Sequence, residues 1–599
     1  MRFPAVLMLV ASATVWAQPP APRLVNGTRI DRLIVGGKVR LSLDDAIALA
    51  LENNLDVELQ RYNRRLAATD LLRAQGGGSL RGIPLSIREG PASVGVPVVT
   101  GAGLGGGDAP ALDRLEGAGA QLDLSILGSL PLSTGPAVPN FDPSVTATIG
   151  WDHKSDPQNS SFLTPLRSLN SKTATGNVGI DQGFATGGTL SLGFQNLRQS
   201  SNTPLLSYSP YSAASLGLSL RQPLLRGAWS GVNTRYIHIA RNNQHVSDLV
   251  FRQQVIGTVY SVIRLYWDLV SLTEDVRVRQ EAVTSAEKLL KDTEESADTG
   301  VLAAIDVTRA RAEIARRRRD LIVAQSLVRQ QSERLKDYLT RAEDSALQGV
   351  PLEPSETLRE PQPEILEGFD TLVSQAFRER PDLAQARIQL TNSEISLKGS
   401  RSALLPAVDV IASAANNGLA GDPSTFTTAP SLNPYLTGGY GDSLSQIFRR
   451  NFPDYGVGVQ ISIPIRNRAA RADVARDELQ VSQQAIRIRQ LEKQVRLEIR
   501  SALIALEEAR ASYESARQER ILQEQTLDAE KEKLGVGAST TYLVIQYQRD
   551  VMQARSSETT AQVSYWKARA ALDRAAGSIL QEHHVDVEAA PAPSAVGLR

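Results

Sequence analysis

One structural unit occurs twice in this chain, and each copy joins strand-like sequence to very long helical sequence. In the first copy, residues 215–224 alternate apolar with small or polar side chains, and a helical pattern then runs to roughly Tyr338. In the second copy, residues 456–465 alternate in the same way before a helical stretch that runs to roughly Gly577. Short strands that lead into helices far longer than a globular core needs predict a strand barrel mounted on a helical tube. Such an architecture is typical of a conduit.

Matching segments at two places support the duplication. The sequence around Asp56 matches that around Asp382, and the helical sequence around Val259 matches that around Val495. Fewer residues separate Val259 from Val495 than separate Asp56 from Asp382. The first copy therefore contains extra sequence between its two matching segments, mostly at 76–143 and 152–214. The segment 76–143 is rich in Gly and Pro, so we interpret it as a long irregular insertion.

Composition argues against several classes of function. The 65 Lys and Arg residues balance 65 Asp and Glu residues, so no bulk positive charge favours nucleic acid. Cysteine is absent, which excludes thiol catalysis, thiolate metal sites and a lipid-modified N-terminal Cys. No Walker-type phosphate loop, nucleophile elbow or zinc-protease motif is present. We therefore expect no enzyme activity, no cofactor and no metal site.

Two clusters of charged or metal-ligating residue types have simpler interpretations. Arg316–Arg319 spread around a helix, with Glu313 and Asp320 beside them, and we interpret them as a solvated face. His238 and His245 could share a helix face, but no third ligand is within sequence reach.

The N-terminus predicts export. Arg2 precedes the apolar run from Phe3 to Val15, and small residues at Val15 and Ala17 suit signal-peptide cleavage before Gln18. No later segment has 18 uninterrupted apolar residues, so we expect no transmembrane helix in the mature chain. An exported chain can still span a membrane as a closed barrel.

The strand candidates have the alternation of such a barrel. Apolar side chains share one face while Gly, Ser, Thr, Gln or Arg occupy the other, which suits lipid outside and water inside. Residues 407–412 are a weaker candidate, and 178–180 with 190–194 flank a turn at 185–188 and predict a hairpin. The chain then supplies four strands, or six if that hairpin joins the barrel. The three apolar sets are Val145, Ala147, Ile149 and Trp151; Leu216, Leu218 and Leu220; and Val457, Val459, Ile461 and Ile463.

The helical arms have apolar residues at alternating spacings of four and three, the pattern of a coiled-coil seam. Each pair of arms is interrupted by a short turn, at 299–307 and at 534–543, with Gly at the helix end and Ser539 and Thr540 able to cap the returning helix. We expect these turns to be the tips of two helical hairpins. The seams are Val255, Val259, Val262, Tyr266, Leu269, Thr273 and Val276 in the first copy, and Val481, Ala485, Ile488, Glu492, Val495, Ile499, Ala502, Leu506, Ala509 and Tyr513 in the second.

These patterns divide the chain into consecutive parts. A helix is expected from Leu41 to about Gln75, with Ser42 as its N-cap. The complete division is: signal peptide 1–17; loosely structured leader 18–40; first repeat 41–349, with a helix, the insertion 76–143, strands in 144–224 and a helical hairpin at 228–345; Pro-rich linker 350–367; second repeat 368–577, with a helix, strands in 406–465 and a hairpin at 468–577; and a disordered tail 578–599.

In this order, the motifs resemble the TolC family of outer-membrane efflux and secretion channels. The resemblance covers nearly the whole mature chain except 76–143 and the tail. It depends most on three segments: 43–54 with its Asn53-Asn54 pair, Gln222-Pro-Leu-Leu-Arg-Gly227, and the tip sequence 300–311. The resemblance implies a mainly α fold with membrane β structure, in which three chains close one outer-membrane barrel above a periplasmic α-barrel. It also implies a periplasmic adaptor and an inner-membrane pump as partners, and passive conduction for tripartite efflux or type I secretion.

The resemblance also assigns roles to the tips. Gly300, Val301 and Leu302 of the first tip, with Gly535 and Val536 of the second, would dock the adaptor. The founding member narrows its entrance with paired aspartates from the second tip, whereas this chain has Thr541 and Val544 near those positions. Asp306 of the first tip is the only nearby acid, and the alternative interpretation is that it is a solvated or helix-capping carboxylate. Asp306 and Thr541 are thus the candidates for the periplasmic entrance.

Two other classes of protein fit parts of the sequence. A soluble periplasmic coiled-coil adaptor or scaffold would need an inner-membrane anchor or a lipidated Cys, and neither is seen. An exported enzyme on a helical scaffold would need a cluster of catalytic residue types. The sequence favours the outer-membrane channel, with a closed resting tip held by polar contacts between helices.

Overall fold

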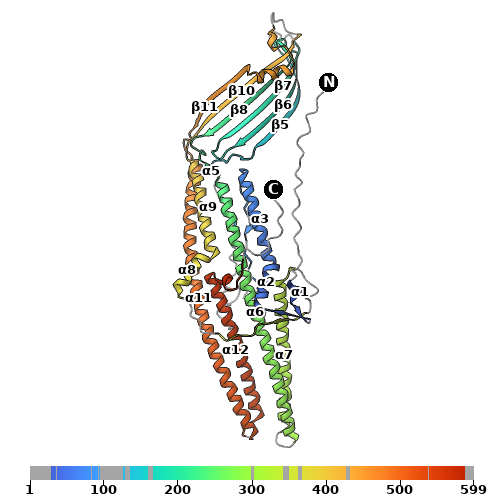
Figure 1. The fold of residues 1–599 in the computed structure, drawn as a ribbon, viewed down its shortest axis with the longest axis vertical. Coiled ribbons are helices and arrows are strands. Elements are labelled where there is room, and N and C mark those ends of the chain that lie inside the picture. Colours follow the sequence, from blue (N-terminus) through green and yellow to red (C-terminus); the bar gives the residue numbers. More distant parts are fainter. Residues whose placement is uncertain are drawn as a thin grey trace.

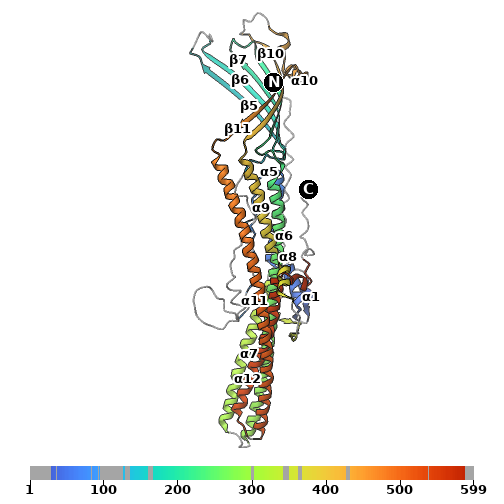
Figure 2. The same ribbon diagram turned by 90° about the vertical axis from the view of Figure 1, so that its left-hand side faces the viewer.

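The computed structural model is a long molecule with one sheet at one end and helices along the rest of its length (Figures 1 and 2). The structure describes residues 29–35, 37–82, 84–85, 87–88, 90–91, 94, 126–127, 135–159, 166–298, 303–341, 350–361, 367–425, 432–536 and 538–586. Most of the Gly-rich insertion 76–143, the signal peptide and the end of the tail lie outside these residues.

Six antiparallel strands form the sheet in the order β11-β10-β8-β7-β6-β5. The expected hairpin is part of it, with Val178 opposite Phe194 and Ile180 opposite Leu192. Of the two strand counts that the sequence left open, the structure therefore has six. The strands are β5 (Ser144–Pro157), β6 (Ser168–Gly183), β7 (Thr189–Ser201), β8 (Tyr208–Pro223), β10 (Ala407–Pro423) and β11 (Phe452–Ser462).

Strand register gathers the apolar side chains on one face. Ile180 lies opposite Val145 on one side and Leu192 on the other, and Leu192 lies opposite Leu218. The row continues through Ala414 to Tyr455 on the last strand. These large side chains are exposed in the single chain, with Ile149 at 78% and Val457 at 81%. A continuous exposed apolar face is the surface that lipid covers on a membrane barrel.

The opposite face of the sheet is mostly polar or small, with Leu197, Ile411 and Phe452 as large apolar exceptions. Thr146, Gly179, Gly193 and Gly217 form one row across four strands. Near the helical end, Arg221 forms an ion pair of 2.5 Å with Asp409, which places the charged residues of β8 and β10 on this face. The alternation predicted for these strands is therefore confirmed.

Two long helical hairpins extend away from the sheet. The first pairs α6 (Arg235–Asp298) with α7 (Ala304–Leu339), and the second pairs α11 (Arg468–Gly535) with α12 (Thr541–Ala576). At about 1.5 Å per residue, the 64 residues of α6 extend roughly 96 Å. Gly577 ends α12 with a φ of 83°, which suits a glycine. The seam residues Val255 to Leu269 and Val495 to Tyr513 are buried as predicted, whereas Ala485 is exposed.

Between the sheet and the middle of the molecule, α3 and α9 take the places of the returning helices. The neighbours in this layer are α3-α6-α9-α11, whereas the layer beyond the middle is α7-α6-α12-α11. The additional helices are α2 (Leu43–Asn53), α3 (Leu55–Gln75), α8 (Phe369–Glu379) and α9 (Pro381–Ala403).

The prediction of one helix from Leu41 to Gln75 is wrong. Asn54 has an extended backbone and separates α2 from α3, and its side chain accepts hydrogen bonds from the N–H groups of Asp56 and Val57. Arg380, at the matching position of the second copy, also has an extended backbone and separates α8 from α9, but its side chain does not cap α9. An Asn that caps the following helix ends the preceding one, because its side chain replaces the missing helical acceptor. Ser42 caps α2 as expected.

The middle of the molecule contains the largest apolar core. It joins α2 and α6 with a three-stranded sheet of β1 (Ile34–Val35), β2 (Lys38–Leu41) and β9 (Leu352–Pro354). The leader, expected to be loosely structured, thus contributes β1, β2 and α1 (Arg29–Leu33). Tyr266 donates a hydrogen bond to the Leu41 carbonyl, and its burial raises the pKa of the phenol to about 12. Two further described elements, α5 (Ser230–Asn233) and α10 (Tyr440–Phe448), lie beside the two ends of the sheet.

One described helix, α6, is long and apolar enough by composition to cross a bilayer, but 72% of its apolar window is buried in the protein. The central core includes α6 residues from Phe251 to Val270, so α6 is a core helix by packing.

We predict that Asn54→Ala lowers the free energy of unfolding by about 1 kcal/mol, because two N–H groups of α3 lose their acceptor. Guanidinium titration of the detergent-solubilised protein measures this change. Thr69→Ala, at an exposed position of α3, is the control and should shift the midpoint little. Equal effects of the two substitutions would show that Asn54 does not act as a cap.

Candidate functional site

The tips of the hairpins lie at the end of the molecule farthest from the sheet (Figure 1). Gly535 is the last residue of α11, and a side chain added at its Cα would meet nothing within 4 Å. Val536 follows it and is 81% exposed. Thr540 caps α12, while the Ser539 hydroxyl donates to Glu530 instead. Gly300, Val301 and Leu302 of the first tip lie outside the described residues.

The two entrance candidates lie in different surroundings. Asp306 is in the first turn of α7, where its carboxylate forms an ion pair of 3.1 Å with Arg309. Thr541 begins α12 and is 3% exposed, and within the described part of the chain its hydroxyl has no hydrogen-bond partner. Their entrance role stays a prediction.

A buried cluster of charges joins the two hairpins near the tips. The Glu313 carboxylate on α7 accepts hydrogen bonds from Arg317 on the same helix and from Arg549 on α12. Arg317 also donates to the Ala282 carbonyl on α6 at 2.9 Å and to the Gln548 side chain at 3.3 Å. Glu313 and Arg317 are 5% and 3% exposed, and Arg549 closes the cluster from its surface side. We call Glu313, Arg317, Gln548 and Arg549 the interhairpin cluster.

Electrostatics favours the ionised form of this cluster. Burial raises the pKa of Glu313, but the hydrogen bonds and charges of Arg549 and Arg317 outweigh it, so the pKa lies below its ordinary value. The hydrogen bond that Arg549 donates to Glu313 also raises the pKa of Arg549. Because breaking a buried ion pair leaves an unpaired charge, the cluster resists separation of the hairpins while both partners are charged.

Further polar contacts continue this connection along α6 and α12. Arg555 forms ion pairs with Glu281 on α6 at 3.1 Å and with Glu524 on α11 at 2.7 Å. Closer to the middle, Lys567 of α12 forms an ion pair of 3.0 Å with Asp268 of α6. Beside this pair, the indoles of Trp267 and Trp566 stack with centroids 5.6 Å apart. The hairpins are therefore held by polar contacts near the tips and by aromatic packing at the middle.

Sequence reasoning missed this cluster. The interpretation of Arg316–Arg319 as a solvated face is wrong for Arg317, although Arg316, Arg318 and Arg319 are exposed. Glu313 and Arg317 are four residues apart and occupy one helix face with the buried Ala310 and Leu321. That spacing against the apolar seam was the available signal.

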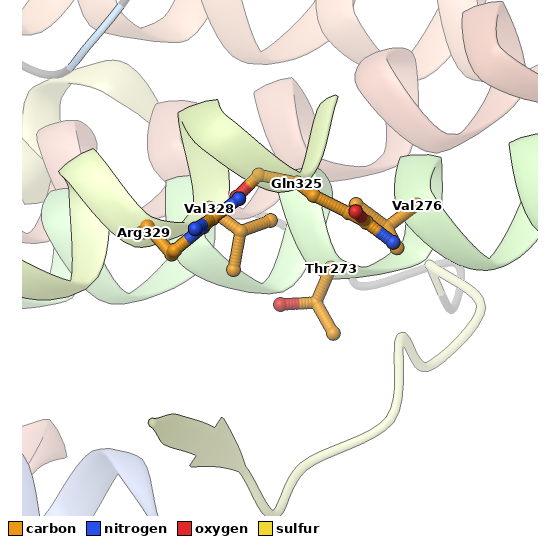
Figure 3. Close-up of a pocket in the computed structure, with 5 residues that line it drawn as sticks. All are labelled: Thr273, Val276, Gln325, Val328 and Arg329. Atoms are coloured by element: carbon orange, nitrogen blue, oxygen red, sulfur yellow. The ribbon is translucent and has the colours of Figure 1, made fainter. Parts of the chain in front are cut away.

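The structure also has a pocket between α6 and α7, lined by Thr273, Val276, Gln325, Val328 and Arg329 (Figure 3). Its single charged side chain is Arg329, whose Nε donates to the Gln325 carbonyl at 3.4 Å. Its lining includes no carboxylate or imidazole that could act as a general base, and the Thr273 hydroxyl donates to the Leu269 carbonyl at 2.8 Å. Among the described residues, no three His, Cys, Asp or Glu side chains form a potential metal site.

Comparisons with known proteins address the architecture directly. A family model described as outer membrane efflux protein matches residues 187–341 and 372–578. The chain belongs to this family. The outer membrane efflux protein BepC of Brucella suis biovar 1 (strain 1330) is 24% identical over 383 residues, which cover 63% of this chain and 74% of BepC.

Solved structures share the fold. The CmeC outer membrane channel of Campylobacter jejuni aligns with a TM-score of 0.54 and 14% identity, over 91% of this chain and 90% of CmeC. The outer membrane protein VceC of Vibrio cholerae aligns with a TM-score of 0.53 and 14% identity, over 89% of this chain and 96% of VceC. The protein is thus an outer-membrane channel for efflux, with its sheet in the outer membrane and its helices in the periplasm. The predicted fold class, localisation and channel function are confirmed.

We predict that the interhairpin cluster is insensitive to pH between 8 and 5. Glu313 has a depressed pKa, so its stabilising contribution is complete above the ordinary value of 4.5 and disappears only as pH falls through the lower folded-state value. Because the chain has no cysteine, spin labels attach only at Arg316→Cys and Gln553→Cys, and they report on the separation of α7 and α12.

The distance distribution should stay narrow from pH 8 to 5 and broaden only at a pH below the ordinary glutamate pKa of 4.5. Glu313→Gln should give the broad distribution already at pH 7. Broadening of the unsubstituted cluster between pH 7 and 6 would contradict the assignment.

Proposed function

We propose that three copies of this chain close one barrel and one helical tube, and that the tube passively conducts substrates delivered by an inner-membrane pump through a periplasmic adaptor. The observation that best supports this proposal is that the six-stranded sheet does not close on itself. Within the described chain, β5 pairs only with β6 and β11 only with β10. A bilayer offers no water to free backbone N–H and C=O groups, so both edges need partner strands. The antiparallel order makes β5 and β11 run in opposite directions, so β5 of one copy suits β11 of the next.

The helical layer has matching edges. On one side, α3 exposes Leu59 and Leu66; on the other, α11 exposes Leu479 and Ile486. These helices are the two outer members of the layer next to the sheet. Exposed apolar rows on opposite edges favour association between copies, which supports a ring that closes through the same neighbours as the strands.

The tips are the proposed contact with the adaptor. From the sequence, we propose Gly300, Val301 and Leu302, together with Gly535 and Val536, as the small or apolar residues of this contact. Exposed Val536 and the open space around Gly535 support a docking surface there. Asp306 and Thr541 are proposed for the entrance. Adaptor binding would favour the open state by binding it more tightly than the closed one.

The interhairpin cluster is the proposed closing contact. It joins α6, α7 and α12 at the end where the tube must open. We propose that it holds the hairpins together at rest and that opening separates Glu313 from Arg549.

We predict that Gly300→Arg with Gly535→Arg weakens adaptor binding at least tenfold while the trimer persists, because a long charged side chain projects from each tip. Pull-down with the adaptor and light scattering measure the two properties separately. Loss of the trimer in this double variant would contradict the tip assignment.

We also predict that Arg549→Ala raises the resting conductance several-fold, since Glu313 then loses its partner on the second hairpin. Planar-bilayer recordings at pH 7 test this. Arg510→Ala, which removes an exposed ion pair within α11, is the matched control and should leave conductance unchanged. Equal conductance of both variants would rule out a closing role for the cluster.

A further inference from the structure

The lipid-facing side of the sheet changes from apolar to basic toward the end that lies away from the helices. On β5 the apolar set ends at Trp151, and the next side chain on this face is His153, whose ring stacks with the indole at a centroid distance of 6.4 Å. On β6 and β7 the outer positions of this face are occupied by Lys172 and Arg198. Tryptophan is enriched where the apolar band of a membrane protein meets the lipid headgroups. The boundary of the bilayer therefore lies close to these residues.

Strand register brings the three basic residues together. Lys172 lies directly opposite His153, and Arg198 lies opposite Ala174, which is the next residue on this face of β6. Lys172 and Arg198 are thus diagonal neighbours on adjacent strands, roughly 7–8 Å apart. Both side chains are exposed, and neither forms an ion pair with another described residue. An unpaired cation on the lipid face of a barrel is costly at the bilayer midplane and tolerated near the headgroups. We call His153, Lys172 and Arg198 the outer basic cluster.

Acidic residues of the same strands lie on the polar face. Lys154 follows His153 on β5, points to the polar face and forms an ion pair of 2.8 Å with Asp156. Asp152 is on this face by strand alternation, and Asp454 of β11 belongs to the row of small residues that crosses it. The strands thus separate their charges, with acids on the polar face and unpaired bases on the lipid-facing side. Such a separation indicates an anionic partner on the lipid-facing side.

Helix α10 extends this basic surface over β8 and β10 (Figure 2). The Tyr440 hydroxyl donates at 2.8 Å to the side chain of Asn196, which shares the lipid-facing side of β7 with the outer basic cluster. At the other end of α10, Phe448 is 77% exposed and precedes the exposed Arg449 and Arg450. Neither arginine forms an ion pair with a described residue. An exposed aromatic ring beside unpaired arginines is typical of an element that lies in a membrane interface.

Two acids lie near this end of the sheet. The Asp442 carboxylate caps α10 by accepting a hydrogen bond of 2.9 Å from the Gly439 N–H, and Asp422 is exposed at the outer end of β10. Lysine and arginine outnumber these acids there, so the surface formed by the outer basic cluster and the end of α10 keeps a positive charge.

We propose that this surface binds the phosphate groups of lipid A, the membrane anchor of lipopolysaccharide, and so fixes the channel in the outer leaflet. The end of the sheet away from the helices faces that leaflet, because the helices lie in the periplasm. Lys and Arg donate charge-assisted hydrogen bonds to phosphate, while Trp151 and Phe448 lie at the depth of the acyl chains. Lipid A carries phosphates at both ends of its disaccharide, so one molecule can contact neighbouring bases together.

The test titrates the detergent-solubilised channel with purified lipid A and follows binding by native mass spectrometry. Lys172→Gln should weaken binding about fivefold, and Lys172→Gln with Arg198→Gln about twenty-five-fold, because each substitution removes one cation from the headgroup level. Lys154→Gln is the matched control, since it removes a base at the same level of the barrel but on the polar face. It should change binding less than about twofold. Equal losses for Lys172→Gln and Lys154→Gln would overturn the proposal.

A second measurement uses the unsubstituted channel, so it does not depend on how the variants fold. Lipid A from which both phosphates have been removed should bind at least about tenfold more weakly than intact lipid A. Equal affinities would show that the acyl chains alone account for binding and would overturn the proposal, as would equally tight binding of phosphatidylglycerol. Lys172→Arg preserves the charge and should retain the affinity for lipid A. Loss of binding in that variant would contradict a phosphate contact at this position.

Discussion

The sheet's two unpaired edges are the constraint on which the rest of the structure depends. A backbone amide in a bilayer must have a hydrogen-bond partner, and the strands of one chain do not provide it for β5 and β11. The chain cannot complete its membrane domain alone, so the surfaces of the helices below must also suit neighbours. The exposed apolar residues on α3 and α11 satisfy that requirement at the same two edges.

Packing along the tube changes in a way that suits a fixed upper part and a movable end. The middle contains the large core of α2, α6 and the small sheet, in which Leu41, Val259 and Leu269 are fully buried. Near the tips, the apolar cluster of Leu527, Val544 and Val551 is small, and the contact of buried Glu313 with Arg549 connects the hairpins instead. The interhairpin cluster resists separation while it is buried, but its charged groups regain hydration once water enters. An opened apolar core instead exposes its whole surface to water. The end of the tube is thus the part that can separate at lowest cost.

Repetitive patterns made much of the fold predictable from the sequence. The spacing from Val495 to Tyr513 identified a buried seam, and the alternation around Val457 identified a lipid-facing strand. The break at Asn54 was missed because Asn within a helical pattern does not reveal whether it caps a new helix. The burial of Arg317 was missed because a run of four arginines suggests exposure to solvent. Arg317 is buried in a cluster with Glu313 and Arg549, and Arg549 lies 232 positions later in the chain. A contact between residues so far apart in the chain leaves no pattern in the local sequence. The residues of the tips could be assigned only from the family resemblance.

The stacked indoles of Trp267 and Trp566 have an optical consequence. The chain has only five tryptophans, and these two lie on different hairpins with their rings 5.6 Å apart and nearly parallel. Two transition dipoles at that distance couple, so the pair contributes a near-ultraviolet exciton signal that depends on the relative position of α6 and α12. The protein therefore contains its own chromophore pair, which distinguishes a movement confined to the tips from one that extends to the middle of the tube.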